Sequence, residues 1–99
     1  MNLKYEAVFI IKIDDEDKIK EVKDRIDNIF ESEGMNVFKK EDFGDKKLAY
    51  EIKKQSSGRY YLINYEVPEG KENREGKFKI KLNTMEEVLK FIIVRMNEE

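Results

Sequence analysis

Residues 3–13 are apolar on both faces of an extended chain, and this pattern limits the folds that the sequence can adopt. One face carries Tyr5, Ala7, Phe9, Ile11 and Ile13. The opposite face carries Lys4, Glu6, Val8, Ile10 and Lys12, so its centre is apolar as well. A strand of this kind needs neighbouring elements on both sides. The pattern therefore predicts a strand in the interior of a sheet.

A helix is expected to follow this strand. The acidic run at residues 14–17 is typical of a helix start, because carboxylates cap free N–H groups and interact favourably with the helix dipole. Apolar residues then recur at spacings of three and four, which is the stripe of an amphipathic helix. They are Ile19, Val22, Ile26, Ile29 and Phe30. Gly34 is expected to end the helix in a left-handed conformation.

Two strands are predicted in the middle of the chain. The first covers residues 35–52 and is interrupted at Gly44 and Asp45, where we expect a bulge or bend. The polar residues 55–58 predict a turn, and residues 59–67 predict the next strand. One face of that strand carries Tyr60 and Leu62, and the other carries Tyr61, Ile63, Tyr65 and Val67.

The last third of the chain is less regular. Residues 71–83 are predicted to be helical, because Phe78, Leu82 and Met85 stand at helical spacing. Phe78, Ile80 and Leu82 also alternate as in a strand, so that alternative stays open. Residues 88–96 predict a final strand. One of its faces is expected to carry Val88, Ile92 and Val94, and the other Leu89, Phe91 and Ile93.

The predicted order of elements is β-α-β-β-α-β. This order indicates an α+β fold of the ferredoxin-like type, with a four-stranded antiparallel sheet and two helices on one face. We expect a single domain at residues 1–96 and a short polar tail at residues 97–99. Because this fold serves many functions, it does not by itself identify one.

The composition excludes several classes of site. The chain has no cysteine and no histidine, which rules out disulfides, thiolate chemistry and imidazole-based catalysis. The apolar runs are too short to span a bilayer, and residues 1–6 lack the pattern of a signal peptide. A net charge of −2 argues against a uniformly cationic nucleic-acid coat but allows a local basic patch. We therefore expect a cytoplasmic protein without a metal or cofactor.

Four short blocks of sequence resemble one protein family. They are KYEAVFII at residues 4–11, FGDKKLAYEI at 43–52, GRYY at 58–61 and EVLKFIIVR at 87–95. In this order and at these distances, they resemble the sixth small-subunit ribosomal protein of bacteria. Residues 69–85 depart from the family pattern, because Gly70 and Gly76 interrupt what is usually a clean amphipathic helix.

The resemblance implies a structural constituent of the small ribosomal subunit and no enzyme. Members of the family bind the central domain of 16S ribosomal RNA together with the eighteenth small-subunit ribosomal protein. The same two partners are therefore expected here, on cytoplasmic ribosomes. No catalytic residue, cofactor, membrane or small-molecule substrate is implied.

The resemblance also points to four basic residues as RNA contacts. Lys46 and Lys47 lie on the stretch where the family contacts RNA, and two ammonium groups beside a glycine reach phosphates without strict geometry. Composition alone would favour a solvated pair in a turn. Lys4 and Arg95 stand where the family has basic residues near RNA, although ordinary strand-end charge explains them equally well. The sequence does not predict that these two residues touch.

An apolar patch is expected on the sheet face that the helices leave open. Tyr60 and Leu62, with Val8 and Ile10, are its predicted members. An open patch of this kind usually marks a binding site for a partner, and the resemblance makes the partner the eighteenth protein. The alternative is that this face is apolar only incidentally.

Two other classes of function stay open on the sequence. RNA-recognition-motif domains share this fold and stack bases on aromatic residues of the third strand, so Tyr60 and Tyr61 allow a free single-strand RNA-binding module. A small enzyme or ligand-binding domain is the other possibility. Its candidate acids, at residues 14–17 and 86–87, are explained more simply for the first group as helix-start charge.

Overall fold

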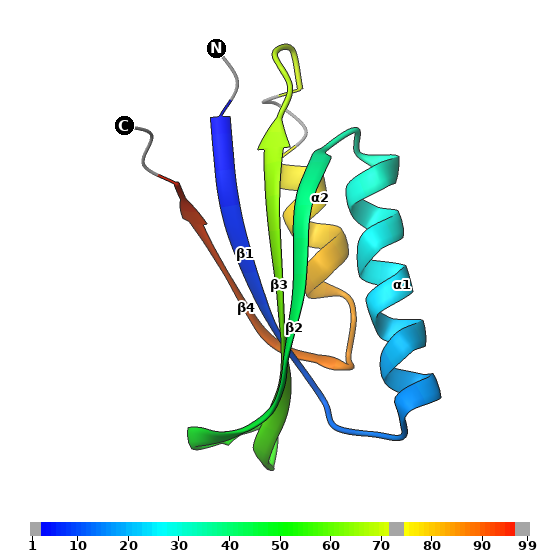
Figure 1. The fold of residues 1–99 in the computed structure, drawn as a ribbon, viewed down its shortest axis with the longest axis vertical. Helices are drawn as coiled ribbons and strands as arrows, with labels where there is room; N and C mark the ends of the chain where they lie inside the picture. The colour runs from blue at the N-terminus through cyan, green and yellow to red at the C-terminus, as the bar shows by residue number, and fades with distance from the viewer. Residues whose placement is uncertain (1–2, 72–74, 97–99) are drawn as a thin grey trace.

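The computed structural model describes residues 3–71 and 75–96 and has the predicted order of elements (Figure 1). The elements are β1 (Leu3–Ile11), α1 (Glu16–Ser32), β2 (Asn36–Ile52), β3 (Gln55–Val67), α2 (Glu75–Asn83) and β4 (Val88–Arg95). The four strands form one antiparallel sheet in the order β2-β3-β1-β4, which confirms the ferredoxin-like prediction and the interior position of β1. The predicted tail at residues 97–99 lies outside the described residues.

Both helices lie on the same side of the sheet, and the main core fills the space between the two layers (Figure 1). Four aromatic side chains form its centre. The Phe30 ring packs edge-on against Phe9, Tyr65 and Phe78, at centroid distances of 6.1, 4.9 and 4.7 Å. All four residues are fully buried. Burial of such large apolar surfaces is the dominant favourable contribution to folding.

The ends of α1 follow the sequence signals. Asp15 is the N-cap, and its carboxylate accepts a hydrogen bond of 2.9 Å from the Lys18 backbone N–H. Gly34 has a φ of +76° just beyond the helix, where the Met35 N–H donates to the Phe30 carbonyl at 3.0 Å. Such a reversal favours glycine because a Cβ is strained at positive φ.

The helix prediction for the last third is confirmed at Glu75–Asn83, and residues 72–74 of the predicted range lie outside the described residues. Phe78 and Leu82 are fully buried, whereas Ile80 is 65% exposed. A strand would have placed all three side chains on one face and given them similar burial. The difference in burial therefore identifies this segment as a helix. Within the described part of the chain, no helix is long and apolar enough to cross a membrane.

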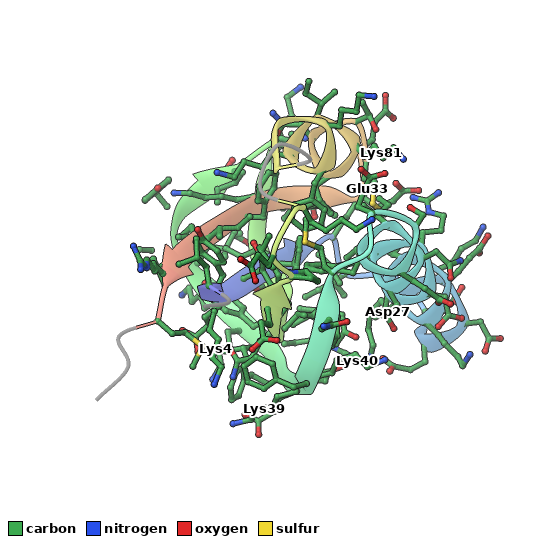
Figure 2. The ribbon with its side chains drawn as sticks, turned by 90° about the horizontal axis from the view of Figure 1, so that it is seen from above. Lys4, Asp27, Glu33, Lys39, Lys40 and Lys81 are labelled. Atoms are coloured by element: carbon green, nitrogen blue, oxygen red, sulfur yellow. The ribbon has the colours of Figure 1, made fainter. Side chains whose placement is uncertain are left out.

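Several ion pairs connect α1 and the residue that follows it to neighbouring elements, and Figure 2 labels the partners of two of them. Lys81 in α2 donates to the buried carboxylate of Glu33, just after α1, at 2.6 Å. Lys40 in β2 donates to Asp27 in α1 at 3.2 Å. Together they join α1 to the second helix on one side and to the edge strand on the other.

The turn between β2 and β3 was predicted wrongly. It is formed by Lys53 and Lys54, both at positive φ, and not by residues 55–58. Residues 55–58 already belong to β3, where Gly58 pairs with Lys46. Lysine is an unusual residue at positive φ, so the sequence carried no turn signal at the true position.

The predicted faces of β4 were wrong at its start. The β1–β4 register shifts between Ile10 and Ile11, so Leu89 is an extra residue in the ladder. Val88 therefore packs in the main core with Phe91, while Leu89 joins Ile10 on the opposite face. A bulge of this kind exchanges the faces of the residues on either side of it.

Candidate functional site

The end of the β2–β3 hairpin, which we call the arm (residues 44–58), bends away from the helices (Figure 1). It lies across the sheet face that carries no helix, which we call the open face. Leu48 of the arm is buried against Ile10 and Leu89. The Lys90 ammonium of β4 donates to the Tyr50 hydroxyl of the arm at 3.1 Å. Because two strands separate β2 from β4, this contact requires the arm to fold over the open face.

The bend begins at the bulge that the sequence predicted. The β2–β3 register shifts between Asp42 and Gly44, and Gly44 has a φ of +81°. The Gly44 N–H donates to the Asp42 carboxylate at 2.7 Å. This confirms the expected bulge, which redirects β2 just before the lysines at 46 and 47.

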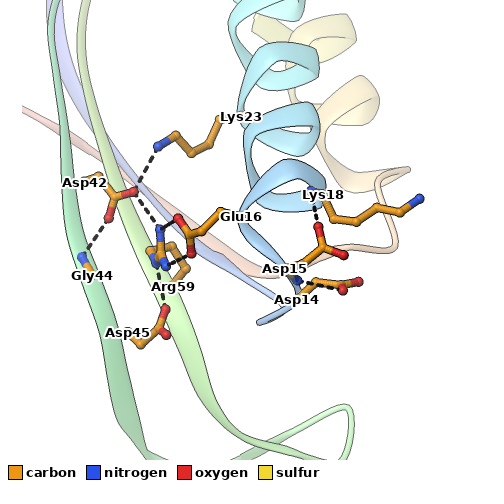
Figure 3. A network of polar contacts seen from close by, with 9 residues as sticks. All are labelled: Asp14, Asp15, Glu16, Lys18, Lys23, Asp42, Gly44, Asp45 and Arg59. Atoms are coloured by element: carbon orange, nitrogen blue, oxygen red, sulfur yellow. Dashed lines mark hydrogen bonds and ion pairs between the residues drawn. The ribbon is translucent and has the colours of Figure 1, made fainter.

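A single arginine holds the base of the arm against α1 (Figure 3). Arg59 of β3 donates to Asp45 at 2.6 Å, to Asp42 at 3.1 Å and to Glu16 at 2.6 Å. The Arg59 side chain is only 12% exposed. Hydrogen bonds to Glu16 and Asp45 raise the pKa of its guanidinium above the ordinary value, so its charge is permanent.

Asp42 belongs to the same network. It also accepts a hydrogen bond of 2.9 Å from Lys23 of α1. Burial raises the pKa of the Asp42 carboxyl, but hydrogen bonds from Lys23, from the Gly44 N–H and from Arg59 outweigh burial and hold the pKa below its ordinary value. Asp42 is therefore ionised at neutral pH, and it fixes β2 to the helical layer.

The two lysines predicted as RNA contacts are both exposed on the arm. Lys46 lies opposite Gly58 and shares the open face, whereas Lys47 lies opposite Ser57 on the other face. Among the described residues, neither has a carboxylate partner within salt-bridge distance. The arm thus presents one free ammonium group on each side.

Sequence reasoning missed two further lysines at the tip of the arm. Lys53 and Lys54 form the turn, are exposed, and have no ion-pair partner in the described part of the chain. With Lys46 and Lys47 they place four ammonium groups on one hairpin. Their charge is visible in a count along residues 44–58, but a turn at residues 55–58 would place both lysines before the turn and not at the tip.

Lys4 and Arg95 lie at the other end of the sheet. Arg95 pairs with Tyr5 in the antiparallel β1–β4 ladder, and the Met96 N–H donates to the Lys4 carbonyl at 2.9 Å. The two residues are thus neighbours in space, a proximity that the sequence did not predict. Their side chains take opposite faces, because Lys4 reaches to 5.8 Å from the Phe38 ring on the open face. The four predicted RNA contacts therefore form two separate groups.

The predicted apolar patch shares one face, as expected, but the arm covers part of it. The four residues Val8, Ile10, Tyr60 and Leu62 all belong to the open face. Ile10 is 7% exposed under the arm and Leu62 is 8% exposed, so neither presents much surface. Val8 and Tyr60 are half-buried and line a shallow groove of about 190 Å³ beside the arm.

Two apolar residues of β4 that the sequence analysis did not single out extend this surface. Ile92 lies directly opposite Val8 and is 48% exposed, and Val94 is 50% exposed. They stand on the open face next to the groove. The sequence shows that Ile92 and Val94 alternate with Phe91 and Ile93. It does not show that their side chains stay exposed on an edge strand.

The RNA-recognition-motif alternative does not fit the third strand. Tyr61 is 4% exposed on the helical side, where its hydroxyl donates to Asp27 at 2.9 Å. Burial and this hydrogen bond raise the pKa of the Tyr61 phenol, which keeps it neutral. Tyr60 is half-buried against the cluster beneath the arm. Base stacking requires exposed aromatic rings on the open face, and this pair offers none.

Comparisons with known proteins agree on one family. A family model described as ribosomal protein S6 matches residues 4–95. The small ribosomal subunit protein bS6 of Trichlorobacter lovleyi is 33% identical over 97 residues, which cover 97% of this chain and 77% of the relative. The protein of the same name from Fusobacterium nucleatum is 35% identical over 95 residues, which cover 95% of this chain and 98% of the relative.

A solved structure shares the fold. The crystal structure of 30S ribosomal protein S6 from Thermotoga maritima matches with a TM-score of 0.85 and 24% identity, over 97% of this chain and 89% of that chain. All four sequence blocks quoted above lie within the residues that the family model matches. The chain therefore belongs to the bacterial ribosomal protein S6 family, a family of small-subunit ribosomal proteins.

Proposed function

We propose that the chain binds the central domain of 16S ribosomal RNA together with the eighteenth small-subunit ribosomal protein, without catalysing a reaction. Family membership supports the ribosomal setting, and cytoplasmic ribosomes are its proposed location. The observation that carries the RNA part is the arm: it holds four exposed lysines without ion-pair partners among the described residues, in a chain of net charge −2.

Free ammonium groups are what a phosphate backbone requires. Other lysines are already engaged by carboxylates, as Lys23, Lys40 and Lys81 show. Within the described part of the chain, Lys46, Lys47, Lys53 and Lys54 have no such partner, so RNA binding at the arm would break no ion pair among these residues. Affinity from such contacts comes with counterion release and falls as salt rises. Lys4 and Arg95 would form a second contact at the far end of the sheet.

The open face is the proposed site for the partner protein. Half-buried Val8 and 48% exposed Ile92 form a cross-strand pair that lines the groove together with Tyr60. Exposed apolar area of this kind is commonly buried in protein–protein interfaces. The arm borders the same face, so RNA and a partner protein on the open face would lie side by side.

The test is a titration of the chain with a central-domain 16S RNA fragment and the purified eighteenth protein, together and separately. We expect Lys46→Glu with Lys47→Glu to weaken RNA assembly and leave the fold intact. Lys20→Glu with Lys77→Glu, on the helical layer, is the matched control and should bind as the unmodified chain does. Normal assembly of the arm variant at moderate salt would refute the RNA assignment of the arm.

A further inference from the structure

The sequence places an acidic residue, Asp45, directly before Lys46 and Lys47. A carboxylate at this position would be expected to repel phosphate and to pair with Lys47, because residues 45 and 47 share one face of β2. The structure shows a different arrangement. Asp45 lies opposite Arg59 in the ladder, and Arg59 Nε donates to its carboxylate at 2.6 Å.

We infer that Arg59 is a positioning residue that keeps the arm cationic by binding Asp45 on the helical side of the sheet. The inference rests on the proposed function and adds to it a residue that strengthens RNA binding without contacting RNA. Alternation along β2 puts Asp45 on the helical side of the sheet, away from the face that Lys46 shares with the groove, and Arg59 neutralises its carboxylate there (Figure 3). The ion pair with Arg59 also keeps the Asp45 carboxylate from pairing with Lys47, which lies on the same face of β2.

Arg59 is suited to this role and unsuited to direct contact with RNA. Its three side-chain nitrogens all donate to carboxylates, from Asp45, Asp42 and Glu16. Its side chain is 12% exposed, while the Asp45 side chain is 48% exposed. A phosphate would have to displace four charge-assisted hydrogen bonds to three carboxylates to reach the guanidinium, whereas loss of Arg59 leaves Asp45 without this partner.

The test is a double-mutant cycle read as affinity for the central-domain 16S RNA fragment in the presence of the eighteenth protein. Arg59→Gln should weaken binding by roughly 3- to 10-fold near 0.1 M salt and lower the salt slope by about 0.7–0.9, as expected for one lost phosphate contact. Adding Asp45→Asn to Arg59→Gln should restore most of both. Asp45→Asn alone should change the affinity by less than about twofold, since Arg59 already compensates that charge.

Glu51→Gln provides the matched control, because Glu51 is exposed on the same arm and has no cation partner among the described residues. Its effect should be the same with Arg59 and with Gln at position 59. If Asp45→Asn also gives equal fold-changes in the two backgrounds, the inference is wrong. If Arg59→Gln does not fold, as judged by circular dichroism, the same cycle is run with Glu16→Gln and Asp42→Asn present throughout. These two changes remove the other carboxylates that Arg59 binds, so that only Asp45 is left unpaired when Arg59 is replaced.

Lys46→Glu with Lys47→Glu, measured alongside, separates the two claims. If this variant loses affinity while the cycle is additive, the role of Arg59 fails and the proposed function stands. If it binds normally, or if the unmodified chain does not bind the RNA, the proposed role of the arm fails and the inference about Arg59 fails with it.

Discussion

Gly58 of β3 lies directly against the side chain of Ile10 in β1. A Cβ at position 58 would meet Ile10 Cγ2 at a distance that real side chains do not adopt, and the Ile11 carbonyl is 3.4 Å away. Gly58 is also the ladder partner of Lys46. The absence of a side chain at this position lets the arm approach the open face closely enough to bury Leu48.

We predict that Gly58→Ala lowers the free energy of unfolding by about 1–3 kcal/mol, because overpacking forces Ile10 or the arm to move. Gly76→Ala is the control: a Cβ there meets nothing within 4 Å in the first turn of α2, so the change should stabilise by about 0.4–1 kcal/mol. Urea unfolding measures both. Equal stability of the two variants would contradict the proposed close packing.

The open face offers a prediction about the partner protein. Ile92→Ser should change stability by less than about 0.5 kcal/mol, since the residue is 48% exposed. It should nevertheless weaken binding of the eighteenth protein by at least roughly fivefold, or about 1 kcal/mol, if it lies within the interface. Calorimetric titration measures the Kd.

Two further variants serve as controls for Ile92→Ser. Ile80→Ser, at a 65% exposed position on α2, should alter neither stability nor partner binding. Ile10→Ser should destabilise the fold by about 2 kcal/mol or more, because Ile10 is buried beneath the arm. If Ile92→Ser binds the partner normally, the part of the open face around Ile92 does not belong to the interface.

The network around Arg59 predicts acid sensitivity. The pKa of Asp42 is lowered in the folded protein, whereas the unfolded chain keeps the ordinary value of 3.8. The contribution of Asp42 to stability is therefore complete above that value and is lost as the pH falls through the lower folded pKa. Glu87 acts in the same direction: its own backbone N–H and Arg25 lower the pKa of its carboxyl.

We expect Asp42→Asn to lose stability at pH 7 and to show a flatter decline between about pH 5 and pH 2 than the unmodified chain. Urea unfolding midpoints across this range provide the measurement. Glu51→Gln, which removes a carboxylate without an ion-pair partner among the described residues, should retain the acid profile. A parallel decline for Asp42→Asn and the unmodified chain would show that the network does not govern acid stability.

Local rules predicted most elements of this fold. The cap at Asp15 and the reversal at Gly34 depend on neighbours within a few residues, and so does the bulge at Gly44. Such features are written in the sequence at short range. The helix at α2 was expected from its position in the order of elements, and the spacing of Phe78 and Leu82 was compatible with a helix but also with a strand.

The arm could not be predicted in this way. Its position depends on Leu48 reaching Ile10 and on Tyr50 reaching Lys90, contacts between strands that are far apart in the sequence. The family resemblance predicted an RNA contact at Lys46, which stays a prediction. It did not predict the ion pair between Asp45 and Arg59, because that depends on which residue of β3 lies opposite. Register is a property of the whole hairpin.

The tip of the arm consists of two lysines whose backbone conformation is unfavourable for a residue with a Cβ. Lys53 and Lys54 have φ values of 49° and 67°, the signs required by a two-residue type I′ turn. Asparagine and glycine adopt this conformation readily, while a lysine pays about 1 kcal/mol or more for it. If the arm binds RNA as proposed, these two charges offset the strain by contacting phosphate.

We therefore predict that Lys53→Asn with Lys54→Gly raises the free energy of unfolding by about 1 kcal/mol and weakens RNA binding. The salt slope for the central-domain 16S fragment should fall by about 1.4–1.8, because two ammonium groups are removed. Lys20→Gln with Lys77→Gln removes the same charge from the helical layer and should leave the slope unchanged. If the turn variant is more stable but binds RNA with the original slope, the tip does not touch phosphate, and the contact is confined to Lys46 and Lys47.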